Sequence, residues 1–257
     1  MNAEKAASIL WRARLDDERL DAIPDDCTPG NVEEGYEIQR AMVAISGRQL
    51  LGWKIAATSE AGQKHIGVDA PVAGRLFEGF ASEDGSTVPA DTMLMRVAEA
   101  EFAFRIGVDL HRAAARYSVA EVTEAVSALH LAIEIPDARF RRFAEVGGAQ
   151  IAADDAFASW FVLGPDVPGW RSLDLVAQRT LFRRNGEVVS RGSGANVLGD
   201  PLVALTWLVN HAAQHEGGVK AGDIVTTGTS LPPADLAPGD AFVAEFEGLG
   251  TVRVTFS

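Results

Sequence analysis

The stretch 95-MRVAEAEFAFRIGVDL-110 alternates between two sets of residues from Val97 to Ile106. Because successive side chains of a β-strand point to opposite faces, this alternation predicts a strand with one apolar face. The apolar face would carry Ala98, Ala100, Phe102, Phe104 and Ile106. Glu99 and Glu101 project together from the other face, with Cβ atoms about 7 Å apart at a rise of ~3.3 Å per residue. They repel one another unless a cation lies between them, or unless water solvates this face and Arg105 screens it.

A third carboxylate lies in the apolar segment 130-HLAIEIPD-137. On a strand, Glu134 shares a face with Ala132, opposite the apolar residues Leu131, Ile133 and Ile135. A buried carboxylate needs a partner, and three carboxylates without a histidine would suit a hard divalent ion such as Mg²⁺ or Mn²⁺. The alternative is a surface glutamate on an edge strand. Spacing leaves both open, because it does not show that the two strands are neighbours.

Two further segments offer polar groups. Lys54 lies inside the predicted strand 50-LLGWKIAATS-59, where it either extends to water or is held for a chemical role. The Gly/Thr loop 226-TTGTS-230 offers backbone N–H groups and hydroxyls for a carboxylate or carbonyl oxygen.

His211 and His215 have the i, i+4 spacing of metal ligands, but there is no HExxH motif and we assign them no metal role. GxGxxG, GxxxxGK[ST] and GxSxG are all absent, so no dinucleotide, P-loop or serine-hydrolase motif is present.

Composition narrows the class of protein. Hydrophobic residues make up 47% and charged residues 23%, which is typical of a globular chain. The formal net charge of −13 argues against nucleic-acid binding but allows an anionic substrate beside a bound cation. A single cysteine, Cys27, permits neither an intrachain disulfide nor a cysteine-based zinc site. With no secretory leader and no apolar stretch of ~20 residues, we expect a cytoplasmic protein without a membrane segment.

The remaining patterns predict an α+β fold with mostly antiparallel or mixed β-structure after a helical N-terminal portion. Helices are predicted over 2–20 and 32–45, the second with a capping box formed by Asn31 and Glu34. The segment 60–86 is expected to be irregular. A helix is predicted over 118–130, with Ser118 and Glu121 as its capping box, and another over 201–216, capped by Asp200. A hairpin at Asn185-Gly186 and three strands after residue 219 complete the prediction.

Six segments resemble, in order, the 2-keto-4-pentenoate hydratase branch of the fumarylacetoacetate hydrolase superfamily, which also includes the 4-oxalocrotonate decarboxylases. They are GWKIAATSEAGQKHIGVDAPVAGRLF, AEAEFAFRIGVDL, AIEIPDARF, GANVLGDPLVAL, GDIVTTGT and EFEGLGTVRVTF, and the resemblance covers about residues 30–257. It implies a mostly β fold of the fumarylacetoacetate hydrolase C-terminal type around a divalent metal, Mg²⁺ or Mn²⁺. The ExE pair of the family maps onto Glu99 and Glu101, the glutamate of its AIEI segment onto Glu134, and its lysine onto Lys54. The implied domains are a helical N-terminal portion with the lysine-bearing strand (1–85) and a β-rich metal-binding catalytic domain (86–257).

The resemblance implies hydratase chemistry in the catabolism of small, aromatic-derived acids. A 2-hydroxy-dienoic acid would tautomerise to a 2-oxo-3-enoate, whose carboxylate and 2-oxo oxygen the metal would hold. Lys54 would move protons while water adds at C4 to give a 4-hydroxy-2-oxo acid. Residues expected to contact this substrate are Thr58, Ser59, Arg139, Ser159 and Thr229. A homo-oligomer is expected, and association with a partner enzyme of the same pathway is compatible with the family.

The sequence departs from the family pattern in the pocket. Val72 stands in place of the aspartate of PDYG, and Phe157 and Ala158 stand in place of the serines of ADNASS. Three alternatives therefore stay open: a decarboxylase of a 2-oxo-3-enedioate, an acylpyruvate C–C hydrolase, and a non-catalytic metal-binding scaffold or partner subunit. The hydrolase is the weaker alternative, because no histidine is plainly placed to activate water.

Overall fold

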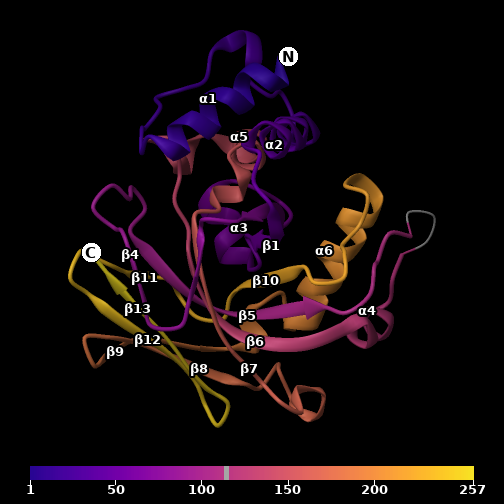
Figure 1. The fold of residues 1–257 in the computed structure, drawn as a ribbon, viewed down its shortest axis with the longest axis vertical. Coiled ribbons are helices and arrows are strands. Elements are labelled where there is room, and N and C mark those ends of the chain that lie inside the picture. The colour runs from indigo at the N-terminus through magenta and orange to yellow at the C-terminus, as the bar shows by residue number, and fades with distance from the viewer. Residues whose placement is uncertain (113–115) are drawn as a thin grey trace.

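The computed structural model describes residues 1–112 and 116–257, and within them the strands form two sheets (Figure 1). The larger, eight-stranded sheet contains β1 (Leu50–Ala56), β2 (Val72–Phe77), β3 (Ala81–Glu83), β5 (Val97–Ile106), β6 (Val126–Ile135), β7 (Trp160–Asp166), β10 (Ile224–Thr229) and β11 (Ala234–Asp235). The smaller, five-stranded sheet contains β4 (Ser86–Val88), β8 (Arg179–Arg184), β9 (Glu187–Ser193), β12 (Ala241–Phe246) and β13 (Gly250–Phe256). The order is β2-β1-β10-β5-β6-β7-β3 in the larger sheet, with β11 on β5, and β4-β13-β12-β8-β9 in the smaller.

The two sheets share an apolar core on one face of β5. Phe102 of β5 lies edge-to-face with Phe246 of β12, with ring centroids 5.3 Å apart. Since side chains alternate along a strand, Glu99 and Glu101 point from β5 away from this core. Most neighbours in the larger sheet are antiparallel, but β1 pairs with β10 in parallel, so the sheet is mixed. The predicted fold class is confirmed.

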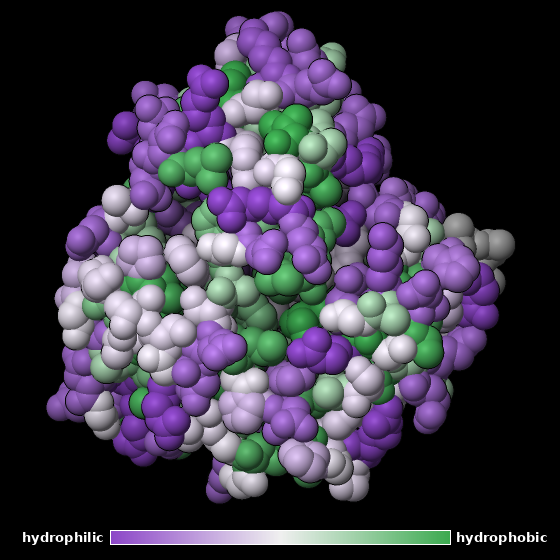
Figure 2. All heavy atoms as spheres, in the orientation of Figure 1, coloured by the Kyte–Doolittle hydropathy of each residue, from purple (hydrophilic) through white to green (hydrophobic). Residues whose placement is uncertain are grey.

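Helices cover the end of the molecule opposite the smaller sheet (Figure 1). They are α1 (Ala3–Leu15), α2 (Val32–Ser46), α3 (Glu60–Ile66) and α5 (Gly147–Ala153), while α4 (Val119–Ala125) and α6 (Pro201–His215) lie at one side of the larger sheet. α1 and α2 bury a small core of their own that includes Leu10, Ile38 and Met42. On the face shown in Figure 2, hydrophilic residues predominate over the top of the molecule and apolar residues gather near the centre. In the described part of the chain, no helix is long and apolar enough to cross a bilayer.

Three predictions of secondary structure were wrong. The helix that begins after Ser118 ends at Ala125, and the chain continues directly into β6, so 126–130 is strand and not helix. Residues 60–86 are not irregular, because α3 and three strands lie there, and β2 pairs with the lysine-bearing β1 along its length. Of the two expected capping boxes, only that of α4 closes: the Glu34 carboxylate accepts from Gly30 and not from Asn31.

Other predictions are confirmed. β8 and β9 form the hairpin at Asn185-Gly186, and Asp200 caps α6 by accepting from the Leu202 N–H at 2.8 Å. The division of the chain at residue 85 stays a prediction. β1, β2 and β3 precede that position and share the larger sheet with β5, β6 and β7.

Candidate metal centre

Three glutamates from two adjacent strands converge on one face of the larger sheet. Glu99 of β5 is the direct register partner of Glu134 of β6, and Glu101 lies two residues further along β5. One carboxylate oxygen from each of the three lies within 4.8 Å of the others. Like charges so placed destabilise a sheet when nothing offsets them. The strand pairing thus supplies the adjacency that spacing alone left open.

The carboxylates of this cluster are buried (Glu101 and Glu134) or half-buried (Glu99) and only partly hydrogen-bonded. Glu101 and Glu134 are each 1% exposed. Among the described residues, Glu101 Oε1 and both oxygens of Glu134 accept no hydrogen bond. Burial raises the pKa of Glu134 to about 7, and burial together with repulsion from Glu134 and Glu99 raises the pKa of Glu101 well above its ordinary value. Unsatisfied, mutually repelling oxygens are the donor set that Mg²⁺ and similar hard cations require, so these residues fit a divalent metal.

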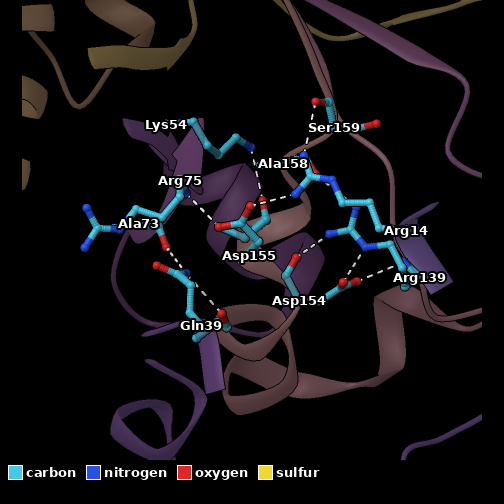
Figure 3. A network of polar contacts seen from close by, with 12 residues as sticks. Arg14, Gln39, Lys54, Ala73, Arg75, Arg139, Asp154, Asp155, Ala158 and Ser159 are labelled. Carbon is cyan, nitrogen blue, oxygen red and sulfur yellow. Dashed lines mark hydrogen bonds and ion pairs between the residues drawn. The ribbon is translucent and has the colours of Figure 1, made fainter. Parts of the chain in front are cut away.

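Lys54 projects from β1 toward the same cluster. Its Nζ lies 3.3 Å from Glu134 Oε1. It also donates to the carbonyl of Ala156 at 3.1 Å, the contact that Figure 3 marks by a dashed line from Lys54. The residue is 3% exposed, so it does not extend to water. Burial lowers the pKa of Lys54, but the charges of Glu134, Glu99 and Glu101 outweigh burial and raise it above the ordinary value. The ammonium group is therefore charged and fixed beside the carboxylates.

The Gly/Thr segment predicted as a loop belongs to strand β10 as far as Thr229, and it holds a carboxylate of the protein itself. The N–H of Gly228 donates to Glu101 Oε2 at 2.9 Å. Gly228 has φ +91°, and a Cβ on it would lie 1.9 Å from Thr58 Oγ1, so no other residue fits here. Thr226, the first residue of this segment, has a buried hydroxyl with no partner among the described residues. Its register partner Ala103 lies on the glutamate face of β5, so the hydroxyl faces the cluster's side of the sheet.

A left-handed turn escaped sequence analysis. Asp155, Ala156 and Phe157 have φ of 56°, 51° and 59°, although none is glycine. Each such residue costs roughly 1–2 kcal/mol, so surrounding contacts must hold the turn. Asp155 is paired with Arg14, and Arg139 is bonded to Asp154 and to the backbone that follows the turn (Figure 3). Adjacent aspartates in the apolar stretch 151-IAADDAFA-158 were the available signal.

The five residues expected to contact substrate lie in different surroundings. Ser59 Oγ caps α3 by accepting from the Gly62 N–H, and Thr229 Oγ1 donates to the Leu231 carbonyl at 2.6 Å. Thr58 packs on Gly228, while the Arg139 guanidinium is occupied by Asp154 and the Ala158 carbonyl. Ser159 lines a cavity of about 250 Å³ together with Arg14, Phe80 and Trp160. The three glutamates do not line this cavity, and we place the chemistry at the glutamates because buried carboxylate oxygens without a hydrogen-bond partner lie there.

Comparison with known proteins agrees with this fold. Residues 67–257 match the model of the fumarylacetoacetate (FAA) hydrolase C-terminal family, and the chain belongs to this family. It is 34% identical over 254 residues to 2-keto-4-pentenoate hydratase of Burkholderia vietnamiensis strain G4, covering 98% of this chain and 96% of that protein. It is 28% identical to 4-oxalocrotonate decarboxylase of Pseudomonas sp. strain CF600, over 97% of this chain and 95% of that protein. The solved 4-oxalocrotonate decarboxylase from Pseudomonas putida G7, complexed with magnesium and adipate, matches with a TM-score of 0.91 and 26% identity over 99% of this chain and 97% of that one.

Proposed function

We propose that this protein is a divalent-metal-dependent hydratase, which adds water to a 2-hydroxy-2,4-dienoic acid and yields a 4-hydroxy-2-oxo acid in the breakdown of aromatic-derived compounds. The observation that carries the proposal is the convergence of three buried or half-buried carboxylates beside a buried lysine. Full-length similarity to a 2-keto-4-pentenoate hydratase supports the substrate class. We assign Glu99, Glu101 and Glu134 as metal ligands, with Mg²⁺ as the first choice and Mn²⁺ as the alternative. Lys54 is the catalytic residue.

The chemistry requires two proton movements near the 2-oxo acid. In the first, the 2-hydroxyl of the dienoate loses a proton and C5 gains one, which gives a 2-oxo-3-enoate. In the second, the oxygen of water bonds to C4 and a proton bonds to C3. When bound, a divalent cation supplies positive charge that favours the enolate form shared by both steps. Lys54 Nζ, held 3.3 Å from Glu134 Oε1, is the group that we assign to these proton transfers.

A second candidate is decarboxylation of a 2-oxo-3-enedioate, because a decarboxylase is the solved structure that matches with a TM-score of 0.91. Such a substrate has a second carboxylate, which needs a cationic partner in a buried site. In the described residues, the three arginines drawn with Lys54 in Figure 3 already have carboxylate partners: Arg14–Asp155, Arg75–Glu216 and Arg139–Asp154. This pairing supports a monocarboxylate substrate, and hence the hydratase.

Thr58 is our first candidate for contact with substrate, because it packs against Gly228, whose N–H donates to Glu101. Ser59, Arg139, Ser159 and Thr229 stay predictions. A homo-oligomer and a partner enzyme of the same pathway stay predictions.

A substrate panel with product masses tests the proposal. Purified protein is incubated with 2-hydroxy-2,4-dienoates, 2-oxo-3-enedioates and acylpyruvates, each with MgCl₂, with MnCl₂ or with chelator. We expect metal-dependent gain of one water by a dienoate, and loss of this product in Lys54→Ala and Glu101→Gln. Release of CO₂ from an enedioate without hydration would establish the decarboxylase instead. Cleavage of an acylpyruvate would establish the hydrolase, and no turnover of any acid would establish the scaffold.

A further inference from the structure

A turn of unusual backbone conformation lies directly against the candidate catalytic lysine (Figure 3). Asp155, Ala156 and Phe157 form this left-handed turn, a conformation that L-residues avoid. The carbonyl of Ala156, at its centre, accepts the hydrogen bond from Lys54 Nζ at 3.1 Å. The turn therefore provides one of two contacts that fix the ammonium group, and Glu134 provides the other.

Asp155 anchors the turn with both of its carboxylate oxygens. Oδ1 accepts from the backbone N–H of Arg75 at 2.7 Å, and Oδ2 accepts from Arg14 Nη1 at 2.9 Å. Arg14 comes from α1, and its Nη2 also donates to the Ser159 carbonyl, at 3.3 Å. The side chains of Arg14 and Asp155 are 4% and 0% exposed, so water does not screen this pair.

Strand β2 packs closely against both the turn and the lysine. Gly74 is the register partner of Lys54. A Cβ on Gly74 would lie 2.3 Å from the carbonyl oxygen of Asp155 and 3.1 Å from Lys54 Cγ. A displacement of the turn is therefore transmitted to the lysine, because no free space separates them.

We propose that Arg14 and Asp155 are positioning residues that set the place of Lys54 Nζ through the Ala156 carbonyl. The inference rests on the proposed catalytic role of Lys54. Arg14 and Asp155 are not members of the glutamate cluster, so loss of their ion pair should misplace the ammonium group and leave metal binding in place. Helix α1 then contributes to the reaction through Arg14, although the matched family region begins only at residue 67.

A double-mutant comparison tests this inference with Mg²⁺ and the dienoate that the protein turns over. We expect Arg14→Met to lower kcat by roughly 10- to 100-fold, since a displacement of about 1 Å has effects of this size. KM should stay within about threefold of the wild-type value, and Mg²⁺ should stabilise the variant as it does the wild type. The control is Arg12→Met, because Arg12 is an exposed arginine on the same helix. It should leave kcat, KM and the stabilisation by Mg²⁺ unchanged. In a Lys54→Ala background, Arg14→Met should lower the residual kcat by no more than about twofold, because both changes act on the same group.

A second variant covers the case in which Arg14→Met does not fold. Asp155→Asn keeps an oxygen acceptor for the Arg75 N–H but presents no carboxylate to Arg14, and it should reproduce the loss of kcat. Equal losses in the Lys54 and Lys54→Ala backgrounds would overturn the inference, as would wild-type kcat in a folded Arg14→Met protein. If Lys54→Ala itself retains wild-type kcat, the proposed function loses its catalytic residue and both proposals fail. Full activity of Arg14→Met beside an impaired Lys54→Ala overturns only the positioning role.

Discussion

Replacing Glu134 with glutamine should change the stability of the fold in opposite directions with and without a divalent metal. In the metal-free protein, burial raises the pKa of Glu134 from an ordinary 4.5 to about 7. The folded state then binds a proton more readily than the unfolded state, so the free energy of unfolding decreases as pH rises through this window. The difference between the pKa of Glu134 in the folded protein and its ordinary value corresponds to a loss of roughly 3 kcal/mol in the free energy of unfolding above about pH 7.

Glutamine preserves the shape of the side chain and carries no charge, so it removes this penalty. Near about pH 8, metal-free Glu134→Gln should be more stable than the wild type by up to roughly 3 kcal/mol. At ~2–4 °C per kcal/mol, the melting temperature should rise by several degrees. Near about pH 5 the two proteins should be close to equal. With millimolar MgCl₂ near pH 8 the order should reverse, since the wild type gains a bound cation and the variant has lost a ligand.

Thermal unfolding of chelator-treated protein at both pH values, with and without MgCl₂, measures these differences. Glu247→Gln removes an exposed carboxylate between β12 and β13 and should show no reversal. The reasoning would be refuted if metal-free Glu134→Gln were less stable than the wild type near pH 8. Equal stabilisation of the two proteins by Mg²⁺ would refute the metal assignment.

Three further changes have distinct expected outcomes. Lys54→Met should reduce kcat by about 10²- to 10⁴-fold while stabilisation by Mg²⁺ persists, and wild-type turnover would contradict its catalytic role. Gly74→Ala should cost about 1–3 kcal/mol in urea unfolding and should also lower kcat, because its Cβ would meet the Asp155 carbonyl. An unchanged unfolding midpoint would show that the turn can move away from the added Cβ at no cost in stability. Ser118→Ala removes the capping box of α4 and should cost about 1 kcal/mol with kcat unchanged.

Local patterns predicted the elements better than their endings and pairings. The alternation of 97–106 marked β5, because a period of two is a property of the strand itself. Ser118 and Glu121 marked the start of α4, but a capping box carries no information about where a helix ends. The β-branched Val126 opens a strand that pairs with β5, and this tertiary pairing outweighs the helical tendency of 126–130.

The candidate site was predictable in its residue types and not in its geometry. Glu99 and Glu101 share a face by periodicity, but the register that places Glu134 opposite Glu99 depends on two strands separated by a helix. The left-handed turn has no glycine to mark it. Its support comes from Arg14, 141 residues away from Asp155 in the sequence, and no local pattern records such a contact.

Strand β10 lies between β1 and β5 in the larger sheet, although it comes from the last part of the chain. During translation, β1 and β5 therefore cannot be joined in one sheet until residues 224–229 have been synthesised, because β10 pairs with both of them. Pairings of such long sequence separation fold slowly and leave unpaired strand edges exposed on the nascent polypeptide. We expect stalled chains that end before β10 to be aggregation-prone, and enzymatic competence to arise only in the final stage of synthesis.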